Sequence, residues 1–189
     1  MKRLSLIIIT FLLSAYMMSA QEHMTFKGIE IDGKPSEMAK KLETVGFTRS
    51  GTEDNIEILS GKFAGYDASI GICPNVDGNA CMVAVIYDDN LDSWSLLKNR
   101  FDSLEKNLIK KYGKPTNEEK TVDKDDFIII SLANKEASWS SIWDTSNGQI
   151  KLSIMVSSNE FFTYSKYVVL GYIDNANHAV DEQQAYDDL

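Results

Sequence analysis

Two cysteines are the residues whose spacing most directly suggests chemistry in this chain. Cys73 and Cys81 enclose PNVDGNA, in which Gly78 suits the left-handed third position of a three-residue hairpin loop. Such a loop would place the cysteines directly opposite each other, with Cα atoms about 4.5–5.5 Å apart. The sequence therefore predicts a Cys73–Cys81 disulfide, worth about 2.5 kcal/mol on the chain-entropy model. A redox pair is the alternative, but the chain has no C-x-x-C motif.

The other residue types used in catalysis or metal binding form no recognisable motif. His23 and His178 lie near the two ends of the chain, on segments expected to be mobile, so neither has an evident rigid support. The acidic run 123–126 begins like a calcium loop, but Ile128 stands at the sixth position, where glycine is required. We therefore expect no catalytic residues, no metal site and no cofactor.

Aromatic residues crowd one segment between two expected strands: Phe161, Phe162, Tyr164 and Tyr167. Connecting segments usually run over the surface, and aromatic side chains are enriched at binding hot spots. The segment is therefore a candidate partner-binding loop. The alternative is that two of the four side chains pack under the edge of a sheet.

The elements that must position these residues are clearest around Asn147-Gly148, the strongest short signal of a β-hairpin. A two-residue turn there predicts that Trp143 faces Leu152 and that Trp139 faces Val156, all on the core side. Side chains alternate along a strand, so the opposite side would be polar and open. The candidate partner-binding residues on that open side are Ser138, Ser140, Lys151 and Ser153.

Further strands and two amphipathic helices complete the expected fold. Residues 56–63, 66–72, 81–88 and 167–173 read as strands, and the Gly78 loop sets a register between the second and third of these. That register pairs Ile72 with Met82, Ile70 with Ala84, and Ala68 with Ile86, as one apolar face.

Helices are predicted at 36–45 and 92–112, each followed by a glycine. The stripe of the longer helix is Trp94, Leu97, Phe101, Leu104 and Leu108. Residues 49–55 read as a loop, and the run 127–130 fits either a strand or a short helix. The acidic end fits either a frayed helix or a disordered tail.

The N-terminal segment and the net charge limit the location and the partners. Residues 1–20 read as an export signal, with Lys2 and Arg3 before an apolar run that is shorter than the roughly 20 residues of a membrane span. Cleavage before Gln21 would remove both cations and change the net charge of −9 to −11. We expect a periplasmic or extracellular protein with no stable membrane anchor. An acidic surface argues against nucleic acid and anionic membranes as partners.

The mature chain divides into two similar halves. Each half is a helix that ends at glycine, followed by a meander of strands. The last strand of the first half, CMVAVIYDDN, aligns with the last strand of the second half, KYVVLGYIDN. The expected organisation is a signal peptide at 1–20, a first α/β repeat at 21–90, a second at 91–175 and an acidic tail at 176–189. A period of about 85 residues fits a tandem α/β duplication rather than a solenoid.

The first half carries a pattern of six residues: Gly33, Ser36, Gly46, Tyr87, Asp88 and Asp89. This pattern resembles the helix-then-meander domain of outer-membrane assembly lipoproteins of the SmpA/OmlA type. Tandem copies resemble the beta-lactamase-inhibitor-protein fold, as in exported bacterial proteins built from small α/β repeats. The resemblance implies an α+β fold with helices on one face of a mostly antiparallel sheet, and a partner bound by the other face. It assigns no functional residue.

Two classes of function remain. A non-enzymatic envelope protein that binds a protein or a glycan through the sheet face and the aromatic loop is favoured, because no stretch carries a catalytic signature. The alternative is a secreted hydrolase with dispersed catalytic residues. An enzyme should have a deep pocket lined by carboxylates or histidine, whereas a binding protein should have an open sheet face.

Overall fold

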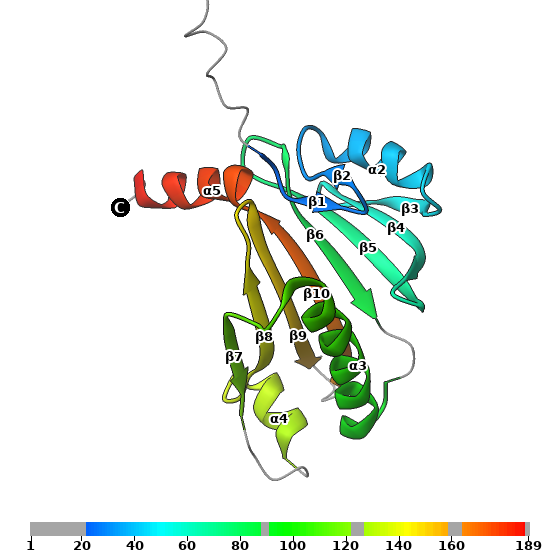
Figure 1. Ribbon diagram of the computed structural model, residues 1–189, viewed down its shortest axis with the longest axis vertical. Coiled ribbons are helices and arrows are strands. Elements are labelled where there is room, and N and C mark those ends of the chain that lie inside the picture. Colours follow the sequence, from blue (N-terminus) through cyan, green and yellow to red (C-terminus); the bar gives the residue numbers. More distant parts are fainter. Residues whose placement is uncertain (1–21, 88–90, 122–126, 159–163, 188–189) are drawn as a thin grey trace, which may run out of the picture.

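The computed structural model describes residues 22–87, 91–121, 127–158 and 164–187, and its main element is an antiparallel sheet of eight strands (Figure 1). The strands are β3 (Thr48–Glu53), β4 (Ile56–Phe63), β5 (Tyr66–Pro74), β6 (Ala80–Tyr87), β7 (Asn117–Lys120), β8 (Trp139–Asp144), β9 (Gly148–Ser158) and β10 (Tyr164–Asp174). Their order across the sheet is β3-β4-β5-β6-β10-β9-β8-β7. The last strands of the two sequence halves, β6 and β10, therefore pair at its centre.

The described residues also form four helices and a small hairpin (Figure 1). These are α2 (Pro35–Glu43), α3 (Trp94–Tyr112), α4 (Ile128–Ala133), α5 (Asn175–Asp187), β1 (Thr25–Phe26) and β2 (Ile29–Glu30). Helix α2 contacts β4 and β5, and α3 contacts β9 and β10. The expected α+β class with a mostly antiparallel sheet is confirmed. None of the helices in this described part has the length and apolarity needed to cross a membrane.

Side chains of the sheet share one hydrophobic core with side chains of α2, α3 and α4. The core side chains of α3 are four of the five predicted ones, Leu97, Phe101, Leu104 and Leu108, and Trp94 packs against them while half-buried. The α3 cap is Ser93, whose hydroxyl accepts a hydrogen bond from the Leu96 amide. We call the sheet face that contributes to this core the inner face, and the opposite one the outer face.

The β8–β9 hairpin has the predicted faces but a different register. Trp143 pairs with Ile150 instead of Leu152, because a connection of four residues, 145–148, replaces the two-residue turn. No residue of this connection has the positive φ that a type I′ turn requires. A shift of two residues leaves every side chain on its predicted face. Trp143 is accordingly 1% exposed in the core.

The β5–β6 hairpin has the predicted turn but the wrong faces on β6. Gly78 has a φ of +75°, and Pro74 pairs with Ala80 as the loop requires. A β-bulge then shifts the register by one residue, so that Cys73 pairs with Met82 instead of Cys81. A shift of one residue turns each side chain of a strand to the other face. The predicted apolar pairs between β5 and β6 are therefore wrong.

The predicted disulfide is not formed, since Cys73 and Cys81 both carry free thiols. The bulge removes the direct opposition on which the disulfide depended, and the Cys81 thiol donates to the Cys73 carbonyl oxygen at 3.5 Å. Burial raises the pKa of both thiols, that of Cys81 to about 11. Because the thiolate is the reactive form, neither cysteine is activated at neutral pH.

Three segments left open or misread by the sequence pattern are ordered. The run 127–130 lies mostly in helix α4, and the acidic end forms α5. Residues 49–53, part of the expected loop 49–55, lie in edge strand β3, all of whose residues are exposed. Pairing with β4 supplies backbone hydrogen bonds that side-chain hydrophobicity cannot reveal.

Candidate functional site

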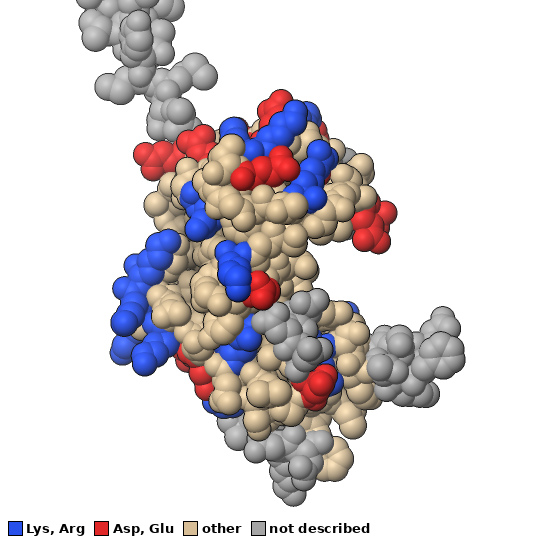
Figure 2. Space-filling view, turned by 90° about the vertical axis from the view of Figure 1, so that its right-hand side faces the viewer, with Lys and Arg blue, Asp and Glu red and all other residues tan. Residues whose placement is uncertain are grey.

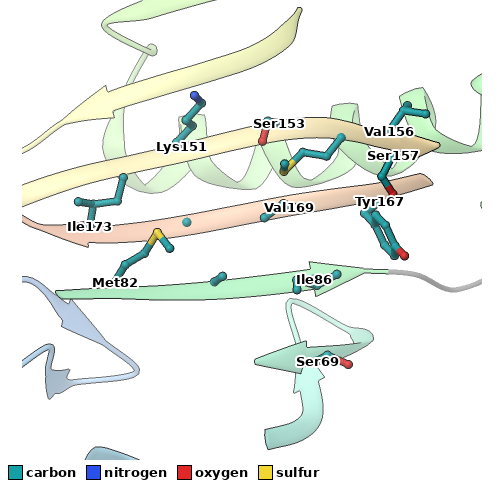
Figure 3. A pocket seen from close by; sticks show the side chains of 13 residues that line it. Ser69, Met82, Ile86, Lys151, Ser153, Val156, Ser157, Tyr167, Val169 and Ile173 are labelled. Atoms are coloured by element: carbon teal, nitrogen blue, oxygen red, sulfur yellow. The ribbon is translucent and has the colours of Figure 1, made fainter. Parts of the chain in front are cut away.

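A groove of about 670 Å³ lies on the outer face of the sheet, across the central strands β6, β10 and β9 (Figure 3). Its described lining residues are Ser69, Met82, Ala84, Ile86, Lys151, Ser153, Met155, Val156, Ser157, Tyr167, Val169, Gly171 and Ile173. This volume falls within the range of about 300–1,000 Å³ that is typical of ligand sites. Most of the lining is aliphatic or methionine.

Strand β6 makes this groove possible because it is apolar on both faces. Val83, Val85 and Tyr87 are fully buried in the inner core. The alternate residues Met82, Ala84 and Ile86 line the groove. An antiparallel sheet with one solvated face normally shows polar residues at such positions. The outer face of this sheet therefore carries a second apolar surface.

Two residues without long side chains face each other in the groove across two strands. Gly171 of β10 pairs with Ala84 of β6. Longer side chains flank this point on both sides, from the pairs Ile173–Met82 and Val169–Ile86 (Figure 3). A Cβ added at Gly171 would meet only the Lys151 carbonyl oxygen, at 3.9 Å, so the space above the glycine is open.

Lys151 is the charged residue among the described lining. Lys151 lies on β9 and is the cross-strand partner of Gly171. Its side chain is exposed, and no carboxylate in the described part of the chain forms an ion pair with it. In Figure 3 its ammonium group extends to the side of β9 away from β10. Figure 2 shows a hollow profile bordered mostly by uncharged residues, with lysine and arginine side chains gathered at the opposite edge of the view.

Some of the predicted binding residues meet in this groove and others do not. Lys151, Ser153 and Tyr167 line it, and Tyr167 lies within β10, which begins three residues before the expected strand 167–173. Ser140 is on β8 and only 5% exposed. The remaining predictions are Ser138, half-buried just before β8, Tyr164, half-buried at the start of β10, and Phe161 and Phe162, which lie outside the described residues.

The sequence prediction missed the β6 and β10 residues that make up much of the groove. The available signal was the continuous apolar run from Cys81 to Tyr87, which is typical of a strand covered on both faces. The predicted register was wrong by one residue, and it assigned Met82, Ala84 and Ile86 to the core. The apolar surface on the outer face was therefore not predicted.

Apart from the groove, a polar cluster surrounds the buried carboxylate of Asp174, at the end of β10. Its oxygens lie 3.1 Å from His23 Nδ1 and accept hydrogen bonds from the amides of Met24 and Asn177, at 2.6 and 2.9 Å. Asp174 is 0% exposed. His23, expected on a mobile segment, is thus held in place, whereas His178 is exposed on α5 and lies 4.0 Å from Asp181.

Asn177 extends this cluster to three other parts of the chain. Its side-chain amide donates to the carbonyl oxygens of Ile31 and Ala80 and to the carboxylate of Asp32, at 3.0–3.2 Å. The hydrogen bond from Asn177 lowers the pKa of Asp32. His23 Nε2 faces Asp32 at 3.8 Å, so the imidazole lies between two carboxylates and has no hydroxyl or thiol partner in the described chain. The arrangement connects the segment after β2 with β6, β10 and α5, and in the described chain it lacks the nucleophile of a catalytic triad.

No group of three or more histidine, cysteine, aspartate or glutamate side chains in the described ranges could hold a metal ion. The outer groove is therefore the candidate functional site, on the strength of its volume, its apolar lining and its unpaired lysine. Comparisons of the chain with protein-family models, with curated proteins and with solved structures found no match.

Proposed function

We propose that this chain is an exported, non-enzymatic binding protein and that the outer groove is its binding site. The observation that carries the proposal is the apolar groove on a sheet face that would otherwise be polar. Exposed apolar patches rimmed by polar residues commonly mark sites of interaction. The described lining contains no carboxylate or histidine, which favours binding over the hydrolase alternative.

Of the two partner classes expected from the sequence, the groove favours a protein over a glycan. A glycan presents many hydroxyl groups, each of which needs a hydrogen-bond partner when buried. The described lining supplies few such partners beyond three serines, Lys151 and Tyr167. Methionine side chains such as Met82 and the 54% exposed Met155 adapt to varied apolar surfaces.

The proposal includes a tandem architecture, with helices on the inner face and the outer face left for binding. Strands β3–β6 and β7–β10 are two successive meanders in the strand order, and they meet through β6 and β10. One helix precedes each meander in the chain. Helix α2 contacts β4 and β5 of the first meander, and α3 contacts β9 and β10 of the second. These features support the resemblance to tandem helix-and-meander domains.

Site-specific photo-crosslinking tests the proposal. A photoreactive residue at Met155 should capture one partner from the native envelope fraction, because this side chain is exposed beside the groove. The matched control is the same residue at Leu96, which is 48% exposed on α3 and is not among the groove residues. Equal capture from both positions, or from neither, would contradict a binding site in the groove.

A further inference from the structure

Within the groove, a row of small residues between longer side chains forms a trough that crosses β6 and β10. Ala84 and Gly171 form its floor. Its walls are the side-chain pairs Met82–Ile173 and Ile86–Val169. Met82 and Ile86 are four residues apart on one strand, so their Cα atoms are about 13 Å apart. Side chains stand roughly perpendicular to a sheet, so the walls keep this spacing. The volume of the wall side chains makes the free space between them narrower than the distance between the Cα atoms.

The shape of the trough limits what can occupy it. An α-helix with its side chains is about 10–12 Å in diameter, too wide to descend between these walls. A peptide strand cannot be added by backbone hydrogen bonds, because β6, β10 and β9 are each paired on both sides. A single extended, unbranched alkyl chain is narrow enough to lie between these walls, and the aliphatic lining favours an apolar occupant.

One end of the trough carries a charge. Beyond Gly171 the next residue in register is Lys151, whose apolar stem lines the groove and whose ammonium group is exposed and unpaired in the described part of the chain. A lysine of this kind keeps its stem on apolar surface and its charge in water. We propose that the trough binds one unbranched alkyl chain with an anionic head group, and that the head group pairs with Lys151. This inference rests on the proposed function, because it names a ligand for the same groove.

The test compares three amphiphiles with the same twelve-carbon chain, each below its micelle concentration: laurate, dodecyl maltoside and dodecyltrimethylammonium. Laurate should bind at least about tenfold more tightly than the cation, because a charge-assisted contact is lost. Methyl-labelled methionine should show an NMR shift at Met82, which forms part of one trough wall. Met24 and Met38, which are buried in the core, should be unchanged.

Two variants separate the chain site from the head-group site. Gly171→Leu fills open space and should abolish binding of all three amphiphiles while the melting temperature stays unchanged. Lys151→Glu should weaken laurate at least about tenfold and leave dodecyl maltoside unaffected. Lys110→Glu, an exposed lysine on α3, is the matched control and should bind laurate as the native chain does.

The inference is overturned if laurate leaves Met82 unshifted, or if the Gly171→Leu protein still binds while its melting temperature shows that it is folded. Equal laurate affinity in Lys151→Glu would remove the head-group assignment. The inferred occupant is a free fatty acid, so laurate should bind while vesicles of phosphatidylglycerol do not sediment the protein. Lys151-dependent sedimentation with the vesicles would indicate a membrane lipid instead and would contradict the inference. Capture of a protein at Met155 without any laurate binding would support the proposed function and contradict this inference alone.

Discussion

At the scale of single residues, the groups that suggest chemistry are used for structure. Asp174 is fully buried, and a buried carboxylate is tolerable only when its oxygens are paired. Its partners are His23 and the amides of Met24 and Asn177, so one side chain connects the start of the described chain to β10 and α5. The sequence could not indicate this, because His23 and Asp174 are 151 positions apart.

Replacing this carboxylate should therefore destabilise the whole fold. Asp174→Ala leaves two backbone amides without their acceptor, and hydrogen bonds to charged groups contribute about 1.5–3 kcal/mol. We expect the free energy of unfolding in urea to fall by at least that amount. Asp102→Ala, which removes an exposed ion pair with Lys98, is the control and should cost less than about 1 kcal/mol. Equal losses in the two variants would contradict a structural role for the Asp174 cluster.

The two free thiols give a second residue-scale prediction. Burial raises the pKa of Cys81 from 9.0 to about 11, so the folded protein holds this proton more tightly than the unfolded chain does. The stability that this group contributes is therefore complete below about pH 9 and is lost as the pH rises through about 11. Alkylation of Cys81 in the native protein should stay slow at pH 9 and accelerate towards pH 11.

In denaturant, alkylation should modify two thiols per chain, and its rate should depend on pH as expected for a cysteine of ordinary pKa. Protein that yields no free thiol in denaturant would show that the cysteines are joined. A Cys81→Ser variant identifies the thiol that titrates near pH 11. The remaining thiol is then Cys73, which pairs with Met82 on the other side of the bulge.

At the scale of elements, Gly148 is required for close approach between strands and not for a turn. Its φ is not positive, and a Cβ there would lie 2.1 Å from the Ile173 carbonyl oxygen of β10. Gly148→Ala must therefore move backbone, and we expect a loss of about 1–3 kcal/mol in urea unfolding. Gly171→Ala on β10 is the matched control, because its Cβ has room and the loss should stay below about 1 kcal/mol. A Gly148→Ala protein as stable as the control would show that β9 and β10 can separate here at little cost.

The two hairpins show how much of the fold could be predicted from sequence. Alternation placed Trp143 on the core side although its partner was wrong by two residues, because a shift of two preserves the faces. The β5–β6 loop was right, yet the bulge moved Cys73 opposite Met82 and reversed β6. A bulge leaves no clear pattern in a strand that is apolar on both faces. The disulfide prediction and the missed half of the groove share this one cause.

At the scale of the whole molecule, the sheet carries apolar residues on both faces, one buried and one partly exposed. The inner face packs into the core, where Trp143 is 1% exposed and its indole nitrogen donates to the Gly113 carbonyl oxygen at 2.9 Å. The outer face keeps its apolar groove open, and Met155 is 54% exposed there. Apolar surface that contributes nothing to the core and remains in solvent is better explained by binding than by stability.

Substitutions on the two faces should therefore separate stability from binding. Trp143→Ala should lower the free energy of unfolding by about 3–5 kcal/mol, because it removes a large core side chain. Met155→Asp should change it by less than about 0.5 kcal/mol, because the side chain is exposed. Binding of the partner captured at Met155 should be lost in the folded Met155→Asp protein and retained in Trp143→Ala at a temperature where that variant is folded. A Met155→Asp protein that unfolds would instead place the outer face in the core of an assembly or a larger fold.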